Sequence, residues 1–168
     1  MNKWIQFTER QGIEPEKMYK LLNTSPIEER DTLHSQNFFN SLIEKKGSIN
    51  CVWSNKSITK KSMHIDHLIP FSVWRNNDLW NLLPTLESIN RKKRDMIPSP
   101  KLLDERKDII INYWEQLEAN FRYQFNREMK ITLMDGRSEE ISIDSSFSNL
   151  CEKCEYLIND RGLTEWTI

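Results

Sequence analysis

The sequence predicts an α+β fold that is mostly helical. Segments near both ends repeat apolar residues every three or four positions, which is typical of helices, and a middle segment of short apolar stretches has strand character. We expect one compact domain over residues 1–168, with a helical scaffold at 1–46 and a small central unit at 47–98. A long helix, a β-hairpin and a terminal helix are expected at 99–168.

The first 46 residues contain two signals for the start of a helix. Pro15 stands where the first turn of a helix accepts proline, and Ser25-Pro26 with acidic residues after it marks a second start. Apolar residues then recur at helical spacing from Phe38 to Ile43, until Gly47 ends the run. This region is predicted to be a helical scaffold.

The central unit is predicted to contain two strands followed by a helix. Ile49–Trp53 and Met63–Asp66 have strand character and are separated by a polar stretch, which favours a hairpin between them. Pro84 interrupts the chain, and Thr85 is a reasonable N-cap for a helix from Leu86 to about Met96.

Residues 102–127 are predicted to form one long helix. Its apolar stripe is typical of a core or a partner-binding face and consists of Ile110, Trp114, Leu117, Phe121 and Phe125.

Two further elements are predicted near the C-terminus. Ile131–Leu133 and Ile141–Ile143 alternate around Asp135-Gly136, which indicates a hairpin. A last helix over Leu150–Ile158 is expected to end before a terminal strand through Trp166.

Charge is distributed unevenly along the chain, although the net charge is only −1. Residues 51–94 contain eight Lys and Arg against three acids, a charge of +5, so the remainder carries −6. A basic island on an acidic body suits a local phosphate contact, and the alternative is a solvated surface. With three cysteines and no apolar run long enough for a signal or a membrane span, we expect a cytoplasmic protein without a membrane partner.

The residues most suited to chemistry lie within this basic island. Asp66 is a hard oxygen ligand of the type that Mg²⁺ prefers, and His67 has an unperturbed pKa of about 6.5 that suits proton transfer from water. Asn90 lies on the predicted helix and offers a second hard oxygen. Lys93 and Arg94 follow three and four positions later, so we expect them to share its helix face and contact phosphate.

The joint pattern of DHLIP from Asp66, NLLP from Asn81 and NRKKRD from Asn90 resembles the HNH (ββα-metal) endonuclease family over roughly residues 49–98. It looks most like members whose last motif residue is Asn, such as the HNH domains of RNA-guided CRISPR nucleases. The resemblance implies a ββα-metal nuclease unit embedded between the helical flanks.

The resemblance implies roles for four residues. His67 matches the general base, Asp66 and Asn90 match the ligands of one Mg²⁺, for which Mn²⁺ or another divalent ion can substitute, and Asn81 matches an asparagine that braces the loop carrying the histidine. The implied activity is hydrolysis of DNA phosphodiester bonds, by nicking or by double-strand cleavage. The basic residues that we expect to contact DNA are Lys60, Lys61, Arg91, Lys93 and Arg94.

The chain departs from many HNH proteins at the positions of their structural zinc. The first CxxC pair would fall at Cys51 and Ser54, and the second at Leu86 and Ile89, so no structural zinc is expected and packing of the flanks is expected to replace it. The separate pair Cys151 and Cys154 fits half a zinc site, a redox pair, or a helix with one buried and one exposed thiol, and we favour the last.

Three alternatives remain open. His64, two residues before Asp66, is an outer ligand, a phosphate contact or a boundary histidine, and we favour the last two.

The chain could also be a nucleic-acid-binding subunit with a vestigial site. A second rival to the nuclease is an interaction subunit whose aromatic helix binds a protein partner, and a homodimer is also open.

Overall fold

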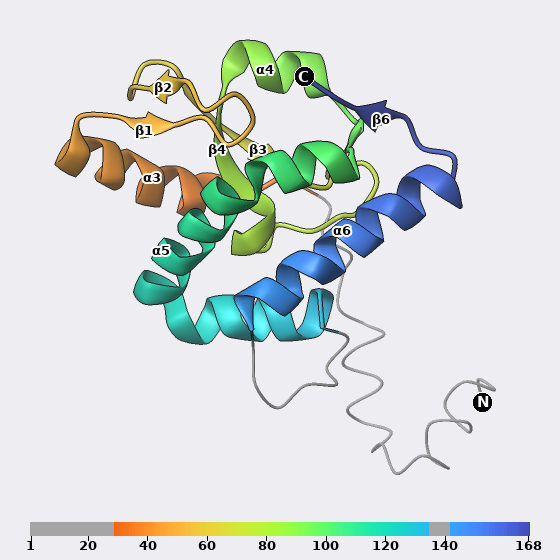
Figure 1. Cartoon of the computed structure of the whole chain (residues 1–168). Helices are drawn as coiled ribbons and strands as arrows, with labels where there is room; N and C mark the ends of the chain where they lie inside the picture. The colour runs from red at the N-terminus through yellow and green to blue at the C-terminus, as the bar shows by residue number, and fades with distance from the viewer. Residues whose placement is uncertain (1–28, 135–141) are drawn as a thin grey trace.

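The computed structural model describes residues 29–134 and 142–168. It is an α+β structure in which helices dominate and the sheets are small (Figure 1). The elements in chain order are α3 (Leu33–Lys46), β1 (Ile49–Asn50), β2 (Ser57–Ile58), β3 (Met63–His67), the 3₁₀ helix η1 (Leu79–Asn81), β4 (Leu82–Leu86), α4 (Glu87–Lys93), β5 (Ile97–Pro98), α5 (Pro100–Thr132), α6 (Ile143–Asn159) and β6 (Glu165–Trp166).

Helix α3 confirms the last helical run of the N-terminal region. It ends at Gly47, whose φ of 82° lies in the left-handed region that glycine adopts without a steric cost. The predicted helix starts at Pro15 and Ser25-Pro26 lie outside the described residues.

The central unit is a ββα unit, but its two strands are not the predicted pair. β3 pairs with β4 in antiparallel register, with Ile65 opposite Pro84, whereas β1 pairs with the short β2. Pro84 therefore lies inside a strand, and its carbonyl accepts a hydrogen bond from the Val52 amide at 2.9 Å. A proline is tolerated there because it lacks only the amide donor, and its carbonyl still pairs.

Thr85 is correspondingly a strand residue and not a helix cap. Its side chain is buried and lies 3.4 Å from the Sγ atom of Cys51. Helix α4 begins one residue after the predicted start and ends at Lys93, three residues before Met96, because Arg94 takes a φ of 52° and reverses the chain.

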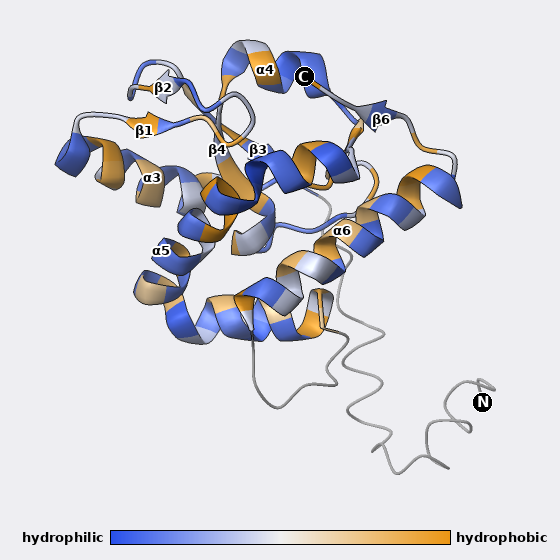
Figure 2. Cartoon of the chain, in the orientation of Figure 1, coloured by the Kyte–Doolittle hydropathy of each residue, from blue (hydrophilic) through white to orange (hydrophobic). Residues whose placement is uncertain are grey.

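The long helix is confirmed, with a kink at Phe121, where φ is −131° and ψ is 39°. The aromatic rings of His34 and Phe38 on α3 pack against Phe121 at this point. The other four residues of the predicted stripe are fully buried, and Figure 2 shows α5 and α6 with hydrophobic and hydrophilic residues on different faces. The stripe is thus core.

The described residues that were expected to form the strands of the C-terminal hairpin are helical instead. Ile131 lies in α5 and Ile143 begins α6, while the turn at Asp135-Gly136 lies outside the described residues. Helical continuation keeps Met129 and Leu133 in the core, which the alternating pattern did not indicate. The last helix is confirmed but starts earlier, and the expected terminal strand is β6, which pairs in parallel with β5.

No helix in the described part of the chain is both long enough and apolar enough to cross a membrane.

Candidate active site

Strand β3 places Asp66 and His67 at its last two positions. Asp66 lies opposite Leu83 and His67 opposite Leu82 in the ladder with β4. Both residues are buried, with exposed fractions of 3% and 1%. A buried carboxylate and a buried imidazole require partners, because desolvation is otherwise costly.

Asn81 holds the loop that leaves β3. Its Oδ1 accepts from the Ile69 amide at 2.8 Å, and its Nδ2 donates to the Ile69 carbonyl at 3.1 Å and to the Asn76 carbonyl at 3.4 Å. Its own carbonyl accepts from the Leu68 amide at 2.8 Å. These are backbone hydrogen bonds of the kind expected for a residue that braces the loop after His67.

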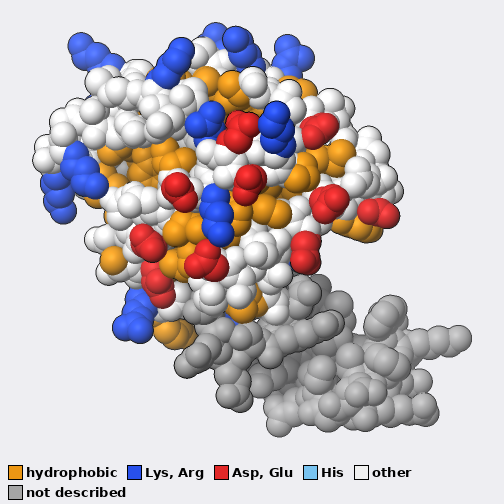
Figure 3. Space-filling view, in the orientation of Figure 1, with side chains coloured by type: hydrophobic (Ala, Val, Ile, Leu, Met, Phe, Trp, Pro, Cys, Tyr) orange, Lys and Arg blue, Asp and Glu red, His pale blue; other side chains and the backbone are white. Residues whose placement is uncertain are grey.

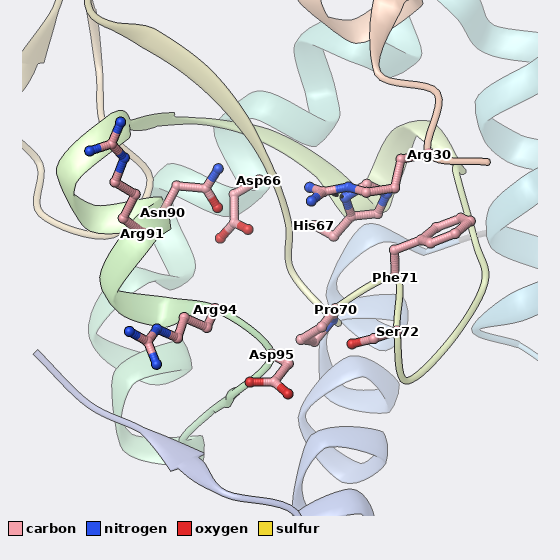
Figure 4. A pocket seen from close by; sticks show the side chains of 10 residues that line it. All are labelled: Arg30, Asp66, His67, Pro70, Phe71, Ser72, Asn90, Arg91, Arg94 and Asp95. Carbon is pink, nitrogen blue, oxygen red and sulfur yellow. Dashed lines mark hydrogen bonds between the residues drawn. The ribbon is translucent and has the colours of Figure 1, made fainter.

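Asn90, on helix α4, lines the same cleft as Asp66 and His67. Its side chain is half-buried, and Figure 4 shows its carboxamide and the carboxylate of Asp66 turned toward one another. Glu87 in the first turn and three basic residues in the last turn complement the helix dipole. The structure therefore brings Asp66, His67 and Asn90 together at one cleft, which has a volume of about 430 Å³.

Lys93 is not the surface phosphate contact that the sequence suggested. Its side chain is fully buried, and its Nζ donates to the His67 carbonyl at 2.7 Å and lies 3.3 Å from Oδ2 and 3.4 Å from Oδ1 of Asp66. Trp53 completes the environment of this carboxylate by donating from Nε1 to Oδ2 at 2.7 Å. Because α4 ends here, Lys93 points into the domain while Arg94 remains exposed.

Both ring nitrogens of His67 are engaged. An Arg30 nitrogen lies 3.2 Å from Nδ1, and the Asn77 Oδ1 lies 3.2 Å from Nε2. The Asn77 amide donates to the Glu29 carbonyl at 3.0 Å, which fixes which of its ends faces the imidazole. Since guanidinium only donates, Nδ1 must be the acceptor and Nε2 must carry the proton.

The environment of His67 favours a neutral imidazole. Burial lowers its pKa to about 4, and the positive charges of Arg30 and Lys93 act in the same direction, against the Asn77 hydrogen bond. At neutral pH the ring is therefore unprotonated at Nδ1, as a general base requires.

Three partners of the site, Arg30, Trp53 and Asn77, were not predicted from the sequence. Arg30 and Asn77 lie outside the short motif strings, and Trp53 is an isolated aromatic residue among strand-forming neighbours. Arg30 lies 37 residues before His67 in the chain, so only the tertiary structure brings it to the imidazole.

The remaining predicted DNA contacts are surface residues. Lys60 forms an ion pair with Glu44 at 2.6 Å, and Arg91 forms one with Glu87, while Lys61 and Arg94 are exposed. His64 is half-exposed and lies 3.7 Å from Glu87. In Figure 3, Lys and Arg side chains gather along the upper edge, where Figure 1 places α4 and β2, and acidic side chains gather across the middle of that face.

The cleft offers oxygen donors that could hold a hard divalent ion such as Mg²⁺. Mg²⁺ is commonly held by one or two protein oxygens together with water and phosphate, and Asp66 and Asn90 provide two such oxygens at the cleft. A carboxylate has about four acceptor sites, so the Trp53 and Lys93 contacts leave capacity on Asp66. Among residues 29–134 and 142–168, no group of three or more His, Cys, Asp or Glu could form a metal cage.

The cysteine positions have packing roles in the described structure. Cys51 is buried, and Leu86 and Ile89 pack against the core. On α6, burial raises the pKa of the Cys154 thiol to about 12 and also raises that of the half-buried Cys151. A thiol held protonated is a poor nucleophile and ligand, which favours the interpretation of this pair as helix residues with one buried thiol.

Comparison with known proteins gives a family match for the central segment. Residues 51–99 match the HNH endonuclease family model, while a search of curated proteins finds no match for the chain. The matched residues begin at Cys51, before β2, and include β3, β4, α4 and the cleft residues Asp66, His67 and Asn90. The central segment of this chain, residues 51–99, is therefore similar to the HNH endonuclease family.

Proposed function

We propose that this protein is a metal-dependent endonuclease that hydrolyses phosphodiester bonds of DNA at the cleft of Asp66, His67 and Asn90. The observation that carries the proposal is the convergence of these three side chains at one cleft inside the segment that matches the HNH endonuclease family. Their roles follow the resemblance noted above, including the asparagine at the last motif position.

His67 is the general base in this proposal. Its Nδ1 has the lone pair, which Arg30 contacts in this structure, so Nδ1 would take a proton from the water that attacks phosphorus, while Nε2–H is held by Asn77. Asn81 positions the imidazole by holding the following loop. Asp66 and Asn90 would hold a divalent ion, which stabilises negative charge on the phosphoryl group and the leaving oxygen when bound.

The DNA backbone would be held by the exposed basic residues around the cleft. Arg91 and Arg94 line the cleft, and Lys60 and Lys61 lie in the turn between β2 and β3. Surface ion pairs such as Lys60 with Glu44 are weak, so these side chains can exchange a carboxylate for a phosphate.

The test is cleavage of supercoiled plasmid with Mg²⁺ or Mn²⁺ and with EDTA. We expect His67→Ala to lower the rate by about 10²- to 10⁴-fold while binding of the metal, measured by calorimetry, is kept. Asp66→Ala and Asn90→Ala should weaken metal binding as well as cleavage. The matched control is His64→Ala, which removes an imidazole three residues before His67 that does not line the cleft.

A folded His67→Ala protein that cleaves at the wild-type rate would contradict the assignment. A second candidate function is a nucleic-acid-binding subunit without catalysis, favoured by the Arg30 contact on His67 and by Lys93 beside Asp66. Wild-type protein that binds DNA but cleaves it with neither metal would support that candidate instead.

A further inference from the structure

We propose that Arg30 is a phosphate-binding residue of this cleft, whose guanidinium leaves Nδ1 of His67 when a DNA phosphodiester binds. The inference rests on the proposed function and adds a residue from outside the matched segment 51–99. It also adds a condition, that the base becomes available only when substrate is present.

The first argument is the hydrogen bonding of the imidazole. Arg30 donates to Nδ1 at 3.2 Å and Asn77 accepts from Nε2–H at 3.2 Å, so neither nitrogen is free to polarise a water molecule. Nε2 has no lone pair to offer in this tautomer. Proton transfer to His67 therefore requires the Arg30 contact at Nδ1 to open.

The second argument is that the partner of Arg30 is a poor match for its charge. Among the described residues the guanidinium forms no ion pair with a carboxylate and donates to a neutral imidazole. A phosphate oxygen offers a charge-assisted and bidentate contact, which is about twice as strong as a neutral hydrogen bond. An incoming phosphodiester should therefore displace the imidazole as the partner of Arg30.

The third argument is position. Arg30 lines the same cleft as Asp66, Asn90 and Arg94, and Figure 4 shows it beside His67, with Arg94 across the cleft on the side of α4. Arg91 also lines the cleft but is paired with Glu87. Arg30 is exposed as a residue, so its side chain can move without opening the core.

The first experiment separates binding from turnover with full-length variants. Arg30→Met should lower kcat/KM for plasmid cleavage by about 10- to 100-fold, the equivalent of one charge-assisted hydrogen bond. Arg30→Lys keeps the positive charge. Its KM should therefore be closer to the wild-type KM than that of Arg30→Met is. The matched control is Arg161→Met, an exposed arginine that does not line the cleft and should leave both constants unchanged.

The second experiment observes the imidazole directly, in EDTA and without cleavage. The chain has three histidines, so ¹⁵N-histidine NMR gives few signals, and His67→Gln identifies the one required. In the free protein Nδ1 should show the shift of a hydrogen-bonded acceptor, and Arg30→Met should move it to that of a free acceptor. Adding a short DNA duplex should move the wild-type signal in the same direction and leave that of Arg30→Met nearly unchanged.

The outcomes distinguish this inference from the proposed function. Wild-type cleavage that Arg30→Met does not slow, or a saturating duplex that leaves the Nδ1 signal of wild type in place, overturns the inference while the nuclease assignment stands. A different result is that wild type does not cleave, while the duplex moves the Nδ1 signal of wild type but not that of Arg30→Met. The nuclease assignment then fails, and Arg30 stands as the phosphate contact. Absence of both responses overturns both.

Discussion

Replacement of Lys93 by Met tests whether the ammonium group is a buried partner of Asp66. The Lys93 side chain is fully buried, and its Nζ contacts Asp66 at 3.3 Å and the His67 carbonyl at 2.7 Å. Removal of one member of a buried ion pair leaves the other charge uncompensated, which costs about 3–5 kcal/mol. We expect a loss of that size, a large part of the roughly 5–15 kcal/mol of a typical domain.

The assay is urea unfolding at pH 7 in EDTA, followed by circular dichroism and analysed by linear extrapolation. Asp66→Asn combined with Lys93→Met should be more stable than the sum of the two single losses predicts, because the carboxamide needs no counter-charge and still accepts from Trp53. Lys92→Met is the control, since Lys92 is an exposed neighbour on α4 and should have no measurable effect. An unchanged free energy of unfolding for Lys93→Met would show that Lys93 is solvated, and would refute the buried pair.

Two further predictions concern the loop and the imidazole. Asn81→Ala should lower both stability, by about 1–3 kcal/mol in urea unfolding, and cleavage, because it leaves the buried backbone groups of Ile69 unpaired; normal stability would show that the loop holds itself. Because the His67 pKa is lowered to about 4 in the folded protein, the unfolded chain binds more protons between pH 6.5 and pH 4. Stability present above pH 6.5 should therefore be lost as pH falls, by up to about 3 kcal/mol from this residue, and the same slope in His67→Gln would contradict the attribution.

Local signals predicted those parts of the fold in which propensity and packing agree. The helix before Gly47 and the stripe from Ile110 to Phe125 could be predicted, because the spacing of their apolar residues matches the helix face that is buried. The pairing of β3 with β4 was not predicted, because a proline usually interrupts a strand. The sequence does not show that β4 can lack one backbone amide donor at Pro84.

In the candidate site, too, some residues could be predicted from the sequence and others could not. Asp66, His67, Asn81 and Asn90 could be identified because a motif spaces them closely along the chain. The direction of Lys93 could not, because a run of four basic residues gives no indication of which one points inward. Arg30 could not be found either, since its relation to His67 depends on packing between segments far apart in sequence.

The flanking helix α5 contributes to the site through the loop and not through the cleft. Three of its side chains hold the segment from Leu79 to Asn81: the Glu128 carboxylate accepts from the Leu79 amide at 2.7 Å, Trp114 donates to the Trp80 carbonyl at 2.8 Å, and Thr132 accepts from the Trp80 indole at 2.9 Å. Asn81, which braces the loop after His67, directly follows the two residues that they hold. The aromatic stripe that could have served a protein partner is thus used inside the domain. These hydrogen bonds and this packing come from a helix outside the matched segment 51–99. For that reason we expect residues 51–99 alone to lack the support that keeps His67 in place.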